Sequence, residues 1–107
     1  MKRADLIKLI PARVRITRDV TYEILFIDSF TDPKQVGECR FHEKQIVIKK
    51  GESPTETYKT YLHEKFHAYS FEFPELNLTE KQVKLLEEAE YKYQKFNKIL
   101  DVLSKNS

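Results

Sequence analysis

Hydrophobic and polar residues alternate along the first part of the chain in a pattern that predicts β-strands. The segments 13–16 and 21–27 are rich in β-branched and aromatic residues, and the Thr-Arg-Asp sequence at 17–19 between them suits a hairpin turn. The segment 28–36 contains Ser, Thr, Asp and Pro and predicts a loop. We therefore expect an antiparallel strand pair followed by a loop.

A second strand pair is predicted after this loop. The segments 37–41 and 45–49 have the composition of strands, and the residues 42–44 connect them. The two pairs together predict a mixed sheet of about four short strands. Because so small a sheet needs a covering layer, a helix must lie on one of its faces.

The clearest helix signal begins at residue 53. Ser53 and Glu56 form a capping box, Pro54 occupies the first helical position, and Pro74 stops the helix. One face of this helix is apolar at the helical period, and we expect that face to lie on the sheet. It comprises Tyr58, Leu62, Phe66, Tyr69 and Phe73.

A second, longer helix is predicted after a cap formed by Thr79 and Gln82. Its expected apolar stripe comprises Leu85, Leu86, Ala89, Tyr93, Phe96, Leu100 and Leu103. A short N-terminal helix within residues 1–10, ended by Pro11, is also expected. Residues 104–107 are expected to fray. The fold class that results is α+β.

Length and composition narrow the possible architectures. A chain of 107 residues with 40% hydrophobic residues suffices for one core, so we expect a single domain over 1–107 and exclude barrels and dinucleotide folds. The lone Cys39 cannot form an intramolecular disulfide. Since neither a secretion signal nor a bilayer-spanning apolar run occurs, we expect a cytoplasmic protein without a membrane partner.

The charge is nearly balanced, with 19 Lys and Arg against 17 Asp and Glu. The net charge of +2 therefore does not by itself indicate a nucleic-acid partner. The N-terminal stretch is more basic, because six basic residues accompany the single acidic residue Asp5; they are Lys2, Arg3, Lys8, Arg13, Arg15 and Arg18. A solvated basic face is the favoured interpretation, and nucleic-acid binding is the alternative.

The predicted helix at 54–73 contains His63-Glu64-Lys65-Phe66-His67, which matches H-E-x-x-H. Two histidines four residues apart project from one side of a helix, so their nitrogens can meet at one Zn²⁺. Glu64 is then placed to take a proton from the water that zinc activates and to return it to a leaving amine. The pattern predicts amide-bond hydrolysis.

The alternative is that these are two ordinary histidines. A chance H-E-x-x-H in a chain with 3 His has a probability of roughly one per cent. Both histidines also lie at least about 100° from the centre of the apolar stripe, so they do not serve to cover the sheet. The metal site is therefore the favoured interpretation.

A catalytic zinc needs a third protein ligand. His42 is a weak candidate because it occupies a predicted hairpin turn. Carboxylates of the second helix are better placed: Glu80 in its first turn, and Glu87, Glu88 and Glu90 further along. Each of these acids, taken alone, is also compatible with a solvated or dipole-stabilising role.

The H-E-x-x-H helix, with the strands before it and the capped helix after it, resembles small zincin-type metallopeptidases. These are the SprT-like and ImmA/IrrE-like proteins and the minimal gluzincins, many of them phage-encoded. In SprT-like members the third ligand, usually His, comes as the next helix begins; Glu80 stands at the matching position, which departs from that pattern. In thermolysin-type gluzincins it is a Glu about twenty residues after the second His, which corresponds to Glu87.

Of these two, Glu80 is favoured, because it starts the helix just after the short loop at Pro74. Glu87 lies almost opposite the expected apolar stripe, and if Glu80 ligates, Glu87 is a candidate to orient a ligand histidine. The resemblance also implies a zincin-like fold and a peptide substrate bound along a sheet edge, either 37–41 or 45–49.

Other residues have weaker claims to a role. Cys39 is expected to be a small buried hydrophobic residue rather than a redox group. Among Tyr58, Tyr61 and Tyr69, one is a candidate to stabilise an oxyanion, although Tyr58 and Tyr69 are better explained as core.

The function expected from these residues is that of a cytoplasmic zinc metallopeptidase acting on a peptide or protein substrate. His63, His67 and Glu80, or Glu87 in its place, would hold the metal, and Glu64 would act as base. The alternative is a catalytically silent zincin-like module that binds a host regulator or a nucleic acid.

Overall fold

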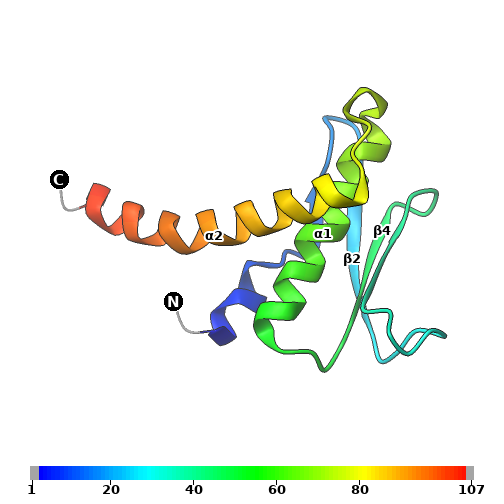
Figure 1. The fold of residues 1–107 in the computed structure, drawn as a ribbon, viewed down its shortest axis with the longest axis horizontal. Helices are drawn as coiled ribbons and strands as arrows, with labels where there is room; N and C mark the ends of the chain where they lie inside the picture. The colour runs from blue at the N-terminus through cyan, green and yellow to red at the C-terminus, as the bar shows by residue number, and fades with distance from the viewer. Residues whose placement is uncertain (1–2, 106–107) are drawn as a thin grey trace.

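The computed structural model describes the backbone of residues 3–105 and the side chains of residues 6–92. The chain forms an α+β fold with a four-stranded mixed sheet and two long helices (Figure 1). The elements follow in the order η1 (Arg3–Leu9), β1 (Arg13–Arg15), β2 (Thr21–Ile27), β3 (Gly37–Arg40), β4 (Gln45–Lys49), α1 (Pro54–Glu72), η2 (Pro74–Leu76) and α2 (Glu80–Lys105).

The sheet has the strand order β1-β2-β4-β3. Both expected hairpins are confirmed, because β1 pairs antiparallel with β2 and β3 pairs antiparallel with β4. The two hairpins join through a parallel pairing in which Ile24 lies opposite Ile46 and Phe26 opposite Ile48. β4 is therefore an interior strand, which explains why three successive residues of it, Ile46 to Ile48, are buried.

The N-terminal segment forms a helix of the 3-10 type, η1, rather than a regular α-helix. Its Leu6 is buried and joins the hydrophobic core with Tyr22, Ile46 and Leu62. The basic residues Arg13, Arg15 and Arg18 are exposed, and the first two lie on the edge strand β1. Lys2 and the side chain of Arg3 lie outside the described residues.

α1 begins as the sequence predicts. Ser53 Oγ accepts a hydrogen bond from the backbone N–H of Glu56 at 3.2 Å, and Pro54 occupies the first turn. The helix ends at Glu72, shortly before Pro74.

The prediction of which face of α1 lies on the sheet is wrong in part. Tyr58 and Leu62 are buried, but Phe66, Tyr69 and Phe73 are only half-buried. The side toward β3 carries Thr60 and Glu64 instead, since both lie against Gly37. The reason is that the sheet, η1 and α2 all contact α1, so several of its faces are covered and a single apolar stripe does not identify the sheet side.

α2 is capped by Thr79, as expected: Gln82 N donates to Thr79 Oγ1 at 3.1 Å, and Thr79 N donates to Gln82 Oε1 at 2.8 Å. Its predicted apolar stripe is wrong within the described side chains, because Leu85, Leu86 and Ala89 are exposed. The face that α2 turns to α1 comprises Val83, Glu87 and Tyr91.

Several predictions concern the C-terminal part of the chain, where the structure describes few side chains. The side chains of Tyr93, Phe96, Leu100 and Leu103 lie outside the described residues. The helix continues to Lys105, so residues 104–105 of the expected frayed tail are helical, and 106–107 lie outside the described part. Among the residues that were described, none of the helices has both the length and the apolar character that crossing a bilayer requires.

Candidate metal centre

His63 and His67 lie one helical turn apart on α1 and point to the same place. Their ring centroids are 4.8 Å apart, and the two Nε2 atoms approach to 3.2 Å. Both side chains are partly buried. The i, i+4 spacing therefore brings two imidazole nitrogens to one point, as the H-E-x-x-H pattern predicts.

Glu80 completes this cluster from the first residue of α2. Its Oε1 lies 2.6 Å from His63 Nε2, and its Oε2 lies 3.1 Å from His67 Nε2. The chain reverses between the helices through η2, where Asn77 adopts a left-handed φ of 43° and Leu78 N donates to Ser70 Oγ at 3.0 Å. This turn brings the start of α2 back beside the histidines.

The spacing within the cluster of His63, His67 and Glu80 is compatible with three ligands of one metal ion. One ligand atom from each of the three residues lies within 4.8 Å of the others. Two ligands of a tetrahedral Zn²⁺ are about 3.3 Å apart, since each is about 2.0–2.1 Å from the ion. The separations of 3.2 and 3.1 Å match this value. The shorter contact between His63 and Glu80 has the length of a charge-assisted hydrogen bond, and the 70% exposed Glu80 side chain has room to shift.

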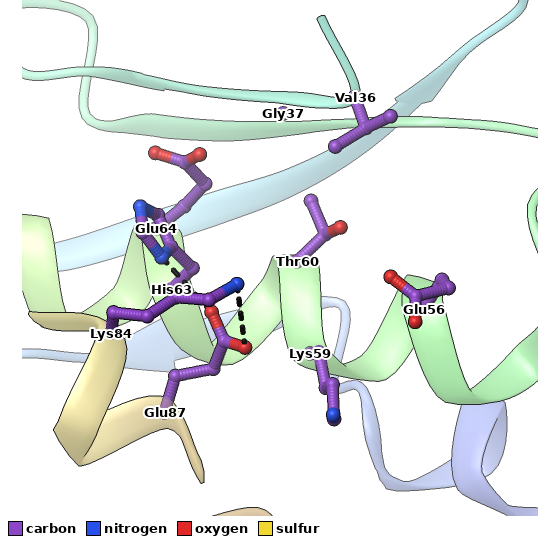
Figure 2. Close-up of a pocket in the computed structure, with 9 residues that line it drawn as sticks. All are labelled: Val36, Gly37, Glu56, Lys59, Thr60, His63, Glu64, Lys84 and Glu87. Carbon is purple, nitrogen blue, oxygen red and sulfur yellow. Dashed lines mark hydrogen bonds and ion pairs between the residues drawn. The ribbon is translucent and has the colours of Figure 1, made fainter.

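Glu87 holds His63 from the other side of the ring. Its Oε1 lies 3.0 Å from His63 Nδ1, and its side chain is buried at the α1–α2 contact (Figure 2). A carboxylate only accepts, so Nδ1 of a neutral His63 carries the proton and Nε2 presents its lone pair to the cluster. This is the arrangement by which an outer carboxylate orients a metal-binding histidine. Glu87 thus contacts one of the two histidines, because α2 turns that face inward; that it orients a metal ligand stays a prediction.

A proton or a metal ion can bridge the groups of this cluster. The carboxylate of Glu80 faces His63 Nε2, and His67 Nε2 adjoins both. Burial lowers the pKa of His67, which favours its neutral form. A cation that accepts all three atoms as ligands would satisfy the arrangement.

Glu64 projects from α1 toward β3 (Figure 2). A Cβ built on Gly37 would come within 2.5 Å of Thr60 Cγ2 and 3.0 Å of Glu64 Oε2, so the strand crosses directly over these side chains. This cover removes water from the carboxyl group. Burial, opposed by the nearby His63, raises the pKa of Glu64 to about 7.

A cavity of about 230 Å³ opens beside Glu64 and His63 (Figure 2). Its walls come from the start of β3, from α1 and from α2, and the residues that line it are Val36, Gly37, Glu56, Lys59, Thr60, His63, Glu64, Lys84 and Glu87. Lys84 lies at this opening with Nζ 3.6 Å from Glu87 Oε2.

The sequence did not single out Gly37, Thr60 or Lys84 as parts of the site. A signal existed for Gly37, because only 2 glycines occur in the chain and one of them lies inside a predicted strand. The sequence signal for Thr60 was weaker: this residue precedes His63 by one turn on the same helix face. Nothing in the sequence distinguished Lys84 from the other lysines of α2.

Other sequence candidates lie elsewhere. The side chain of His42 is exposed beside Phe71, with ring centroids 6.2 Å apart. Glu88 and Glu90 form ion pairs with Lys59 and Lys65 of α1, at 2.9 and 3.0 Å. These two ion pairs therefore hold α2 against α1.

Cys39 and the tyrosines belong to the core or its edge. Burial raises the pKa of Cys39 to about 12, so its thiol is protonated at neutral pH. Cys39 packs against the hydrophobic core but is only partly buried, whereas a buried residue was expected. Tyr58 and Tyr61 are buried core residues, and Tyr69 is half-buried at its edge.

Only one of the two segments proposed to bind a peptide substrate is an edge strand of the sheet. β4 pairs on both sides, with β2 and β3, so the suggestion of 45–49 is wrong. Within the described sheet β3 pairs with β4 alone, and the face of β3 at Gly37 lies against Thr60 and Glu64 of α1. The segment available for adding a peptide strand beside the histidine helix is therefore Gly37–Arg40.

Comparison with known proteins gives no relative: no family model matches the chain, and neither the curated proteins nor the solved structures contain a match. The function has to be argued from the chemistry of the site.

Proposed function

We propose that this protein is a zinc-dependent peptidase with a zincin-like centre. The observation that carries the proposal is the convergence of His63 Nε2, His67 Nε2 and the Glu80 carboxylate within 4.8 Å of one another. Nitrogen and carboxylate ligands in this number are those of catalytic zinc sites, which keep one position open. Glu87, bound to the opposite nitrogen of His63, supports the same assignment.

In this proposal His63, His67 and Glu80 hold the ion, and Glu87 keeps His63 in the tautomer that binds it. A bound zinc ion would supply Lewis-acid polarisation of a peptide carbonyl and of water. Glu64 acts as the general base: it takes a proton from the attacking water and passes it to the amine that leaves. Its place under β3, next to the cavity, keeps this proton away from bulk solvent.

The substrate is proposed to be an extended peptide. β3 is an edge strand beside Glu64, so a peptide added to it would run past the catalytic carboxyl group. The cavity beside His63 and Glu64 has room for one side chain of that peptide. Val36 and Thr60 contribute the apolar part of its wall.

The test is Glu64→Gln in the full chain loaded with zinc. Hydrolysis of fluorescein-labelled casein is expected to fall by about 10²- to 10⁴-fold, the usual contribution of a general base, while zinc binding is kept. Glu75→Gln, an exposed position on η2, is the control and should leave the rate unchanged. A zinc-loaded wild-type protein that cleaves nothing would contradict the peptidase proposal and favour the silent binding module.

A further inference from the structure

Two stacked phenylalanines lie where β3 ends, outside the hydrophobic core and the metal centre. The rings of Phe41 and Phe71 have centroids 4.5 Å apart and planes inclined by 16°. We call these two residues the ring pair. Lys44 Nζ lies 5.1 Å from the centre of the Phe71 ring, and His42 adjoins its edge, yet the Phe71 residue is 43% exposed. These contacts fix the rings in place and leave an apolar surface open to solvent.

α1 connects the ring pair to the proposed base. Phe71 follows Glu64 by seven residues, so the two side chains lie about 10 Å apart along one face of the helix. Glu64 lies against Gly37, at the start of β3. Phe71 stacks on Phe41, which is four residues and about 13 Å further along the strand direction. β3 therefore runs beside α1 from the proposed base to the ring pair.

The backbone of β3 offers hydrogen bonds along the same stretch. Lys49 N donates to Val36 O at 2.9 Å, so every second residue from Val36 onward directs its backbone groups to β4. Gly37 and Cys39 direct theirs to the side away from β4. Gln35 Nε2 already donates to Gly37 O at 3.1 Å. An added peptide strand is therefore expected to pair at Cys39, next to the ring pair.

The orientation of this peptide follows from the stability of strand pairs. Antiparallel pairing is the more stable arrangement per residue, and it lays the N-terminal part of the peptide toward Phe41 and its C-terminal part toward Gly37. Residues directly opposite each other in such a pair point to the same face. The peptide residue opposite Phe41 thus directs its side chain to the face that bears the ring pair. It precedes the residue opposite Gly37 by four positions.

We propose that the ring pair binds an aromatic or large aliphatic side chain of the substrate, on the N-terminal side of the bond that is cleaved. This inference rests on the proposed function, in which cleavage takes place beside Glu64. The substrate class is then an extended peptide with Phe, Tyr, Leu or Met four positions before the residue opposite Gly37. An acidic side chain gains little there, because Lys44, which adjoins the ring pair, already binds Glu72.

The sequence preference of the zinc-loaded full-length protein tests this assignment. Cleavage of a mixed library of synthetic dodecapeptides, read by mass spectrometry, should favour aromatic and large aliphatic residues at this upstream position. In a well-cleaved peptide, replacing that residue by Gly should lower kcat/KM about tenfold, mainly through KM, because the contact is remote from the cleaved bond. Equal rates for the two peptides, or a preference confined to the C-terminal side, would overturn the inference and leave the peptidase proposal standing.

A variant of the ring pair tests the same preference from the side of the protein. Phe71→Ser should cleave the original peptide and its Gly version at equal rates, with the rate on the Gly version close to that of the wild type. Phe26→Ser is the matched control, because Phe26 is 40% exposed and lies on β2; it should keep the preference. A general loss of structure would lower both rates together. A preference that survives in Phe71→Ser would overturn the assignment.

A binding measurement separates this inference from the peptidase proposal. The zinc-loaded Glu64→Gln variant is incubated with the same library, and the peptides that remain bound through gel filtration are identified by mass spectrometry. Aromatic and large aliphatic residues should be enriched, and the enrichment should disappear in Glu64→Gln/Phe71→Ser. Enrichment combined with a wild type that cleaves nothing would support the ring pair and contradict the peptidase. Absence of enrichment, or its persistence in the double variant, would overturn the ring pair.

Discussion

Two polar clusters lie on α1, and they differ in how their charges are satisfied. Toward the end of the helix, Glu72 Oε2 accepts hydrogen bonds from Tyr22 Oη at 2.7 Å and from Lys44 Nζ at 2.5 Å. In the middle of the helix, His63 and His67 face the carboxylate of Glu80. The first cluster pairs one carboxylate with two donors, whereas the second gathers three side chains that can each be a metal ligand.

The Glu72 cluster has the properties of a structural clamp. Lys44, in the β3–β4 turn at a φ of 56°, also lies 5.1 Å from the ring centre of Phe71, so it ties the turn to α1. Burial acts to raise the pKa of Glu72, but the hydrogen bonds from Lys44 and Tyr22 outweigh it and hold the pKa below its usual range. This cluster needs nothing from outside the chain.

The His63 cluster is different because its three side chains are all potential metal ligands. Glu87 contacts His63 at Nδ1, and the Nε2 atoms of His63 and His67 turn toward Glu80. Under the proposed function this cluster is a ligand site rather than a clamp. The predictions below separate the two clusters.

The largest effect is expected for His67→Ala. Loss of one of three zinc ligands should weaken zinc binding by more than about 100-fold, since even outer partners of a metal site contribute 10- to 100-fold. Isothermal titration calorimetry with zinc alone measures it. Glu72→Gln is the control and should leave zinc affinity unchanged. An equal loss of zinc affinity in both variants would contradict the distinction between the two clusters.

Glu87→Gln is expected to have a smaller effect on the same measurement. The amide oxygen still accepts from His63 Nδ1, but the negative charge is lost, so zinc affinity should fall by about tenfold. The neighbouring Glu88→Gln, which loses only its ion pair with Lys59, should bind zinc like the wild type. If both variants behave alike, Glu87 does not orient His63.

Gly37→Ala should disturb the metal-site half of the molecule through packing. The new methyl group would meet Thr60 Cγ2 at 2.5 Å, so we expect a loss of about 1–3 kcal/mol in the free energy of unfolding. Adding Thr60→Ser removes that carbon and should recover much of the loss. Urea denaturation measures both, and a single variant as stable as the wild type would show that β3 does not lie tightly on α1.

Glu72→Gln tests the clamp and should lower stability by about 1 kcal/mol at neutral pH, because Lys44 is partly solvated. The folded-state pKa of Glu72 lies below the unfolded value near 4.5, so its contribution is complete above that pH and is lost as the pH falls through the folded-state pKa. The stability gap between wild type and variant should therefore close on acidification. The exposed Glu75→Gln is the control, and a pH-independent gap would contradict the assignment.

Local signals predicted much of the fold. Ser53 and Thr79 begin their helices because a side-chain oxygen satisfies a free backbone N–H, and this depends on a few adjacent residues. The convergence of His63 and His67 likewise follows from helical geometry alone. Within the described residues, the expected strands and helices are found with boundaries shifted by a residue or two.

Strand pairing and helix packing between distant parts of the chain were not predictable from local sequence patterns. The parallel pairing of β2 with β4 joins strands separated by a whole hairpin, and no local pattern specifies it. Hydrophobic periodicity also chose the wrong face of α2, because it ignores charge pairs. α1 offers Lys59, His63 and Lys65, and the face of α2 that bears Glu87, Glu88 and Glu90 turns toward them. The leucines at 85 and 86 consequently remain exposed.

The most direct measurement is the metal content of the full-length protein, produced without a histidine tag and dialysed against zinc. Elemental analysis is expected to find about one equivalent of zinc in the wild type and none in His67→Ala. A wild type that takes up no zinc and is no more stable in its presence would contradict the metal centre.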